Sequence, residues 1–287
     1  MTRQSIKSGI HDAHERVSDS YGVIPPDHST PDAPSYDVYN FDRNVVAPLL
    51  LLVSEFASQQ TWPSLSLIDA GSGNGQIAAV YAGMGIGRIT AIDFSMRMLR
   101  AFQNRFLNIP CKGRYQRVLA DIEFLDGVRD ETADIVNFFG VIEHLDSPEK
   151  ALGHTLRILK RGGVLIMGVP RKFSLAHITY SLFGVPPSDW GTKRGFGRYL
   201  SFREKAAYYR YYSPAQVMHL LDLAQIPYTI WKRIPFAHSH MDGISGFWLH
   251  ALGRLGERGY HLIDRIEHLL RKMGAIPGGE WWMIRRD

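Results

Sequence analysis

The stretch "LIDAGSGNGQ" places an acid, Asp69, two residues before three closely spaced glycines, Gly71, Gly73 and Gly75. Between a strand and a helix, such a turn lets the backbone approach a ligand closely and point its N–H groups at it. Dinucleotide sites use the spacing G-x-G-x-x-G, and here Gln76 takes the place of the third glycine. The loop therefore predicts a nucleotide-like cofactor for which NAD is a poor match.

The acid beside the loop narrows the choice of ligand. A carboxylate at Asp69 would repel a pyrophosphate and attract an ammonium group. S-adenosylmethionine carries an ammonium group, a sulfonium cation, a ribose diol and adenine, and it has no phosphate. The charge pattern therefore favours S-adenosylmethionine as the cofactor.

Two more acids end the next two apolar runs. Asp93 closes "ITAIDFS", where a carboxylate can accept hydrogen bonds from both ribose hydroxyls, and Asp121 with Ile122 closes "LADIEF". An acid and an apolar neighbour at that point can hold the adenine amino group and ring. All these residues are predicted at the carboxyl ends of parallel strands, where open α/β sheets bind ligands.

Glu143 and His144 follow the fourth apolar run and are the candidate catalytic residues. The methyl group of a sulfonium is already activated, so the protein must mainly orient the acceptor and exclude water. A base is needed only where the acceptor still carries its proton, and histidine titrates near neutral pH. We therefore predict His144 as the base with Glu143 beside it, and no metal. In the alternative interpretation both side chains cap the following helix or brace the loop.

The elements that must position these residues follow from the alternation of apolar and amphipathic runs. The apolar runs are continuous, which indicates strands of a parallel sheet covered by helices on both faces. Ser213 and the proline after it are typical of a helix start. We expect strands at about 64–70, 88–94, 115–121, 133–141, 162–170, 228–236 and 280–287, and helices at about 42–57, 76–85, 96–106, 147–160 and 213–226.

Three segments depart from this alternation. Residues 1–40 are polar and rich in proline, and they are predicted to form an N-terminal arm or lid. Residues 171–212 carry eight lysines and arginines against two acids, interleaved with aromatic residues, and they are predicted to be a substrate-side insertion. Residues 244–273 have the apolar spacing of two helices. We expect a helical hairpin there, which either packs on its own domain or forms a homodimer interface.

The motifs "IDAGSGNG", "AIDFS", "LADIE", "VIEHLDSPEKAL" and "LKRGGVLIMGVP" occur in this order. Their series resembles the class I S-adenosylmethionine-dependent methyltransferases, in particular the ubiquinone-biosynthesis O-methyltransferase type and related small-molecule methyltransferases. The resemblance covers about residues 40–234 and the last strand, within a methyltransferase domain of residues 41–287. It implies a Rossmann-like, seven-stranded, mostly parallel sheet whose last strand is antiparallel, with helical insertions after the fifth strand and between the sixth and seventh.

The resemblance also implies roles for individual residues. The methionine moiety would lie among the acid and glycines of the loop, the ribose at the end of the second strand, the adenine at the end of the third, and the sulfonium near the end of the fourth. The implied cofactor-binding residues are Asp69, Gly71, Gly73 and Gly75 for the methionine moiety, Asp93 and Phe94 for the ribose, Asp121 and Ile122 for the adenine, and Phe139 for the sulfonium.

The predicted function is methyl transfer to a small-molecule acceptor of biosynthetic metabolism, with oxygen as the favoured atom. The basic and aromatic insertion suits an acidic aromatic or lipophilic acceptor, or peripheral contact with an anionic membrane that holds one. Nucleic acid is not favoured, because "FFGV" stands where amino-directed nucleic-acid methyltransferases show N/D-P-P-Y/F. RNA or protein methylation, and a non-catalytic S-adenosylmethionine-binding module, stay open as alternatives.

Composition adds few constraints. The chain has 287 residues, 45% of them hydrophobic, and a formal net charge of +5, which permits acidic partners without selecting one. Its single cysteine, Cys111, cannot form an intramolecular disulfide, which favours a cytoplasmic location. We expect neither a signal peptide nor a transmembrane helix.

Overall fold

The computed structural model describes most of the chain from residue 45 onward. The described residues are 45–287, without 59, 108, 110–112, 175–176, 179–209, 237–251 and 253–254. The predicted arm of residues 1–40, most of the predicted insertion at 171–212 and most of the first helix of the predicted hairpin at 244–273 therefore lie outside the described residues.

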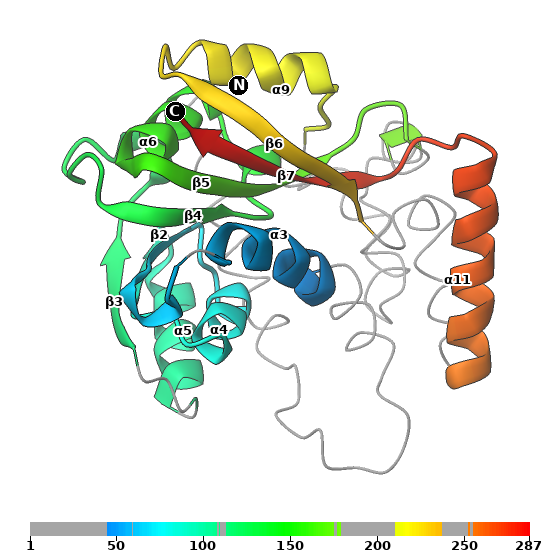
Figure 1. Ribbon diagram of the computed structural model, residues 1–287, viewed down its shortest axis with the longest axis horizontal. Coiled ribbons are helices and arrows are strands. Elements are labelled where there is room, and N and C mark those ends of the chain that lie inside the picture. The colour runs from blue at the N-terminus through cyan, green and yellow to red at the C-terminus, as the bar shows by residue number, and fades with distance from the viewer. Residues whose placement is uncertain are drawn as a thin grey trace.

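The described residues form a seven-stranded sheet in the order β3-β2-β1-β4-β5-β7-β6 (Figure 1). The strands are β1 (Ser66–Ala70), β2 (Arg88–Asp93), β3 (Arg114–Leu119), β4 (Ala133–Phe138), β5 (Leu159–Pro170), β6 (Tyr228–Pro235) and β7 (Gly279–Arg286). The α-helices are α3 (Ala47–Ala57), α4 (Gln76–Gly83), α5 (Met96–Leu107), α6 (Pro148–Ile158), α9 (Pro214–Asp222) and α11 (Glu257–Lys272). Short 3-10 helices are η2 (Trp62–Ser64), η3 (Ile122–Phe124) and η4 (Ile142–His144).

Strand directions agree with the fold class that the sequence predicts. Strands β1 to β5 pair in parallel, and β7 inserts antiparallel between β5 and β6. Strands β1, β4 and β5 are buried along nearly their whole length, which is why their sequences read as continuous apolar runs. The carboxyl ends of β1 to β4 consequently share one edge of the sheet, where the loops with the candidate site residues begin.

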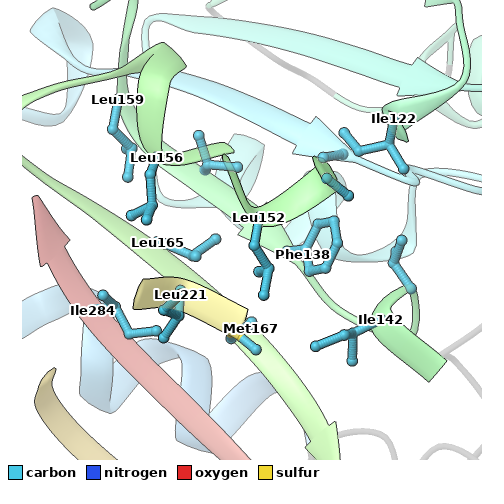
Figure 2. Close-up of a cluster of buried hydrophobic side chains, with 14 of the residues drawn as sticks. Ile122, Phe138, Ile142, Leu152, Leu156, Leu159, Leu165, Met167, Leu221 and Ile284 are labelled. Carbon is cyan, nitrogen blue, oxygen red and sulfur yellow. The ribbon is translucent and has the colours of Figure 1, made fainter. Parts of the chain in front are cut away.

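The core has two layers, one on each face of the sheet. One face packs against α6 and α9, and Figure 2 shows Leu152, Leu156 and Leu221 of these helices against Met167 and Ile284 of the sheet. The other face packs against α3, α4 and α5. None of the helices in the described part of the chain is long and apolar enough to cross a membrane.

The helix boundaries include one confirmed start and several ends that fall earlier than the sequence predicted, such as that of α9 at Asp222 rather than Ile226. The Ser213 hydroxyl accepts from Gln216 N at 3.3 Å, and Gln216 Oε1 accepts from Ser213 N at 3.0 Å, so α9 begins with a capping box. Helix α6 ends at Ile158, whereas the sequence predicted a helix to Lys160. Leu159 already pairs with Ala133 of β4, and Leu159 and Lys160 are the first two residues of β5. Lys160 Nζ donates to Asp134 at 2.8 Å.

Candidate cofactor site

A cavity of about 510 Å³ lies at the carboxyl ends of the parallel strands. Its volume is in the ordinary range for a small-molecule site. Two predicted residues, Gly75 and Glu143, are not part of its lining. The predicted residues that do line it are Asp69, Gly71, Gly73, Asp93, Phe94, Asp121, Ile122, Phe139 and His144.

The glycine loop is built by close packing on both of its sides. Gly71 N donates to Ile92 O at 2.8 Å, which ties the loop to the end of β2. Gly71 has a φ of +73°, and a Cβ there would overlap Val141 Cγ2 of the loop after β4. Gly75 has a φ of +80° and precedes α4, and a Cβ there would lie 2.5 Å from the ring of Phe102 in α5. Gly75 is therefore required for helix packing, whereas Gly71 borders the cavity itself.

The acids at the ends of β2 and β3 also hold the backbone of the site. Asp93 Oδ2 accepts from Gly73 N and Asp93 Oδ1 accepts from Ser95 N, both at 2.8 Å. Asp121 Oδ1 accepts from Glu123 N at 3.0 Å and so caps η3. Both carboxylates line the cavity, and their contacts with ribose and adenine stay predictions.

Asp69 is the most perturbed acid of the site. Its carboxyl is buried, and Oδ1 accepts from Asn137 Nδ2 of the neighbouring strand at 2.7 Å. Burial raises the pKa of Asp69 to about 7; the Asn137 hydrogen bond opposes this rise, and the charge of Asp93 adds to it. Within the described part of the chain, Asp69 Oδ2, Asn137 Oδ1 and Ser72 Oγ have no hydrogen-bond partner.

These unpartnered atoms indicate the kind of ligand that the cavity fits. A buried polar atom without a partner costs about 1–3 kcal/mol, so a ligand that supplies the partner is favoured. Asp69 Oδ2 and Asn137 Oδ1 are acceptors, and both residues line the cavity. An ammonium group brings three N–H donors and a positive charge. The residues present therefore fit the amino end of S-adenosylmethionine.

Asn137 is a site residue that the sequence analysis missed. It lies in "ADIVNFFGV", where one amide interrupts a strand that is otherwise apolar. A polar residue inside a strand buried on both faces needs a partner, and this was the available signal.

The loop after β4 places the two candidate catalytic residues in different surroundings. His144 lines the cavity with 22% of its side chain exposed, whereas the Glu143 side chain is 8% exposed and is not part of the lining. Burial raises the pKa of Glu143 to about 7. Glu143 Oε1 lies 4.0 Å from His144 Nε2. Neither residue caps α6, because that helix begins at Pro148 with Ser147 as its N-cap.

A segment before α9 holds this loop in place. The Tyr212 hydroxyl donates to Ile142 O at 3.0 Å, and Arg210 N donates to Glu143 O at 2.9 Å. Tyr212 N in turn donates to Pro170 O at the end of β5. The position of His144 is thereby coupled to the end of β5 and to the start of α9.

The family model for a methyltransferase domain matches residues 68–167. This span contains the glycine loop, the three strand-end acids and the loop with His144. These residues form a class I S-adenosylmethionine-dependent methyltransferase domain. The match confirms the family that the order of the five motifs predicted, and with it S-adenosylmethionine as the cofactor of the domain.

Relatives of this methyltransferase domain match only part of the chain. An uncharacterized 37.1 kDa protein in a transposon of Streptomyces fradiae is 32% identical over 110 residues, which is 38% of this chain and 31% of that protein. A demethylmenaquinone methyltransferase of Renibacterium salmoninarum is 28% identical over 127 residues, 42% of this chain and 46% of that protein. The chain therefore spans less than half the length of these curated relatives.

Solved structures show the same fold over more of the chain. The [4+2]-cyclase SpnF has a TM-score of 0.54 at 18% identity, covering 89% of this chain and 97% of that one. An S-adenosylmethionine-dependent methyltransferase from Mesorhizobium loti has a TM-score of 0.50 at 13% identity, covering 81% and 96%. At these identities the likeness concerns the fold alone.

Proposed function

We propose that the protein transfers a methyl group from S-adenosylmethionine to a small-molecule acceptor, with oxygen as the favoured acceptor atom. The observation that carries this proposal is the pair of unpartnered acceptors, Asp69 Oδ2 and Asn137 Oδ1, beside the glycine loop. The relatives named for methylating demethylmenaquinone support a lipophilic or aromatic acceptor. The domain match does not distinguish this acceptor class from RNA or protein, so the acceptor assay below includes both.

In this proposal, residues of this chain bind S-adenosylmethionine, orient the acceptor and remove its proton. Asp69 and Asn137 hold the ammonium group, and Asp93 with Phe94 lies at the ribose. Asp121 and Ile122 flank the adenine, and Phe139 borders the sulfonium. When bound, S-adenosylmethionine supplies an activated methyl group, so exclusion of water and alignment of the acceptor supply most of the catalysis.

His144 is the proposed base in this mechanism. It lines the cavity, and its imidazole accepts the proton of the acceptor hydroxyl. Glu143 lies 4.0 Å from His144 Nε2, where a carboxylate stabilises the imidazolium that forms. Both residues are thus proposed to serve one proton transfer, with only His144 touching the acceptor.

Two proposals concern partners rather than the site. Helix α11 leaves Leu262 42% and Leu269 57% exposed, which supports a homodimer through residues 244–273. The formal net charge of +5 is compatible with peripheral contact at an anionic membrane that holds a lipophilic acceptor.

Asp69→Asn is expected to weaken the binding of S-adenosylmethionine at least tenfold at pH 8. The substitution removes the charge that faces the ammonium group and keeps the shape of the side chain. Calorimetric titration with S-adenosylmethionine and S-adenosylhomocysteine measures the loss. Asp126→Asn removes the same charge from a side chain that is 88% exposed, and it is the matched control. Absence of binding by the unmodified protein would contradict the proposed function.

The same titration has an expected pH dependence. Only the Asp69 carboxylate attracts the ammonium group, and its pKa in the free protein is raised to about 7. Affinity is therefore close to its full value at pH 8 and falls as the carboxyl takes up its proton, by about tenfold between pH 8 and pH 6. Asp69→Asn should show a flat profile over this range. An equal slope in both proteins would show that Asp69 does not face the ammonium group.

His144→Gln is expected to slow methyl transfer roughly 100-fold while leaving cofactor affinity unchanged, because the base is lost and the cofactor contacts stay. The acceptor is first found by transfer of tritiated methyl groups to a panel of hydroxylated aromatic and lipophilic compounds, total RNA and protein. His219→Gln on the exposed side of α9 is the control. If His144→Gln and His219→Gln transferred methyl groups equally fast, the base would be a residue other than His144.

A further inference from the structure

The side of the sheet formed by α5 and β3 concentrates positive charge. Residues 94–120 contain six lysines and arginines and no aspartate or glutamate. Two of these arginines, Arg100 of α5 and Arg117 of β3, are exposed. Among the described residues neither side chain pairs with a carboxylate, and Arg117 Nη1 donates to Leu99 O at 3.0 Å. This side of the protein therefore presents positive charge that no acid of the same segment offsets.

Strand β3 is the outermost strand of the sheet, and α5 runs beside it (Figure 1). Unlike β1, β4 and β5, it is exposed along nearly its whole length. The Tyr115 ring lies 5.0 Å from the Phe106 ring of α5, and Arg117 bonds to the backbone of the same helix. Because side chains alternate along a strand, Tyr115, Arg117 and Leu119 all lie on the α5 side. Helix α5 and β3 thus share one solvent-facing surface.

Large apolar side chains lie among these arginines. On α5, Met96, Arg100 and Leu107 follow the spacing i, i+4, i+11, which places them on one face of the helix. Leu107 is 69% exposed and Leu119 is 52% exposed. Single exposed apolar residues are ordinary, but a group of them on two adjacent elements indicates an interaction surface. We call this group the edge surface, and it consists of Met96, Arg100, Leu107, Tyr115, Arg117 and Leu119.

The edge surface begins beside the cofactor cavity. Met98 in the first turn of α5 and Ala120 directly after β3 both line the cavity. Met96 and Leu119 are close to these two residues in the chain, and both are exposed. The end of the edge surface that is nearest to the cavity is therefore apolar, and a partner that covers it lies next to the cavity.

We propose that the edge surface docks the protein on a membrane that contains anionic phospholipids. Arginines with long apolar stems, together with aliphatic and tyrosine side chains, are typical of surfaces that lie in the headgroup region. Anionic headgroups supply the negative charge that residues 94–120 lack. The inference rests on the proposed function in one respect, because docking here holds a membrane-dissolved acceptor next to the cavity.

Two other partners fit the edge surface less well. A second copy that paired through β3 would bring arginines together without an acid between them, and like charges across such a pair repel. Nucleic acid would use Arg100, Arg117 and Tyr115. It would leave Met96, Leu107 and Leu119 without a role, because aliphatic side chains neither stack on bases nor bind phosphates. These side chains are stabilised where hydrocarbon replaces water.

Vesicle flotation of the whole protein without cofactor tests the proposal. At physiological salt, phosphatidylcholine vesicles with one third phosphatidylglycerol should bind the protein, and pure phosphatidylcholine vesicles should not. Arg100→Gln combined with Arg117→Gln should weaken binding roughly 20- to 30-fold, because each cation at an anionic surface contributes about fivefold. Arg88→Gln combined with Arg114→Gln is the matched control and should bind normally. These two exposed arginines pair at the amino ends of β2 and β3, away from the cavity.

Leu107→Ser separates a membrane from nucleic acid. It keeps every charge and removes an exposed apolar side chain, so it should weaken vesicle binding at least fivefold or so. Equal binding to the two kinds of vesicle, or an equal loss in the two arginine pairs, would overturn the inference. Binding of total RNA in place of vesicles, unchanged by Leu107→Ser, would also overturn it and assign the edge surface to nucleic acid. Arg100→Gln alone repeats the test without loss of the Arg117 bond to α5.

Failure of the proposed function is distinguishable from failure of this inference. Titration with S-adenosylhomocysteine tests the cofactor site and shows at the same time that each variant folds. If the unmodified protein does not bind S-adenosylhomocysteine, the proposed function is wrong, and flotation still decides whether the edge surface binds anionic vesicles. If it binds S-adenosylhomocysteine but no vesicles, only the inference is wrong.

Discussion

Gly71→Ala is expected to weaken S-adenosylhomocysteine binding by about 100-fold or more. A non-glycine residue at a φ of +73° costs about 1–2 kcal/mol. The new Cβ would also overlap Val141 Cγ2, and overpacking of this kind costs a further 1–3 kcal/mol or so. Gly71 and Val141 both line the cavity, so either one must move into the space that the cofactor needs.

Gly73→Ala separates the effect of backbone strain from the effect of overlap with Val141. Its φ is +51°, and no atom of the described residues lies within 4 Å of a Cβ there, so the substitution costs about 1–2 kcal/mol of backbone strain without displacing Val141. We expect a loss of affinity several-fold smaller than in Gly71→Ala. Calorimetric titration measures both, and thermal unfolding reports the effect on stability. Equal losses in the two variants would show that contact with Val141 does not shape the cavity.

Glu280→Ala is expected to lower the free energy of unfolding by about 3–5 kcal/mol, because it leaves two partly buried guanidinium groups without their shared carboxylate. Glu280 Oε1 accepts from Arg171, and Oε2 accepts from Arg233 Nη2 at 2.7 Å and from Trp282 Nε1 at 3.1 Å. The Arg171 side chain is only 14% exposed. This carboxylate joins the end of β5, β6 and β7 on one face of the sheet.

Urea denaturation measures this effect, and Glu55→Ala is the matched control. Glu55 pairs with Lys232 at 2.7 Å, but its side chain is 43% exposed, so its loss should cost less than about 1 kcal/mol. Similar changes in the two variants would show that the Glu280 network contributes no more than a surface ion pair.

Local patterns in the sequence determined most of the fold and the general location of the site. The continuous apolar runs and the turns between them predicted the strands of the sheet, and the family resemblance, not the local pattern, implied that the last strand is antiparallel. Asp69 and Asp93 lie at the carboxyl ends of β1 and β2 and Asp121 lies just beyond β3, and parallel strands bring such ends to one edge. These features depend on residues that are neighbours in the chain, so they are visible without the tertiary structure.

The tertiary structure alone decided which of these side chains meet. Asn137 lies opposite Asp69 through the register of β1 and β4, and Gly75 and Glu143 turn out to lie behind the cavity lining. Phe139 contacts the rings of Phe236 and Trp281, which lie about 100 and about 140 positions later in the chain, because β7 inserts between β5 and β6. Local periodicity tells which residues are buried, but the order and register of the strands set their partners, and these depend on contacts between distant segments.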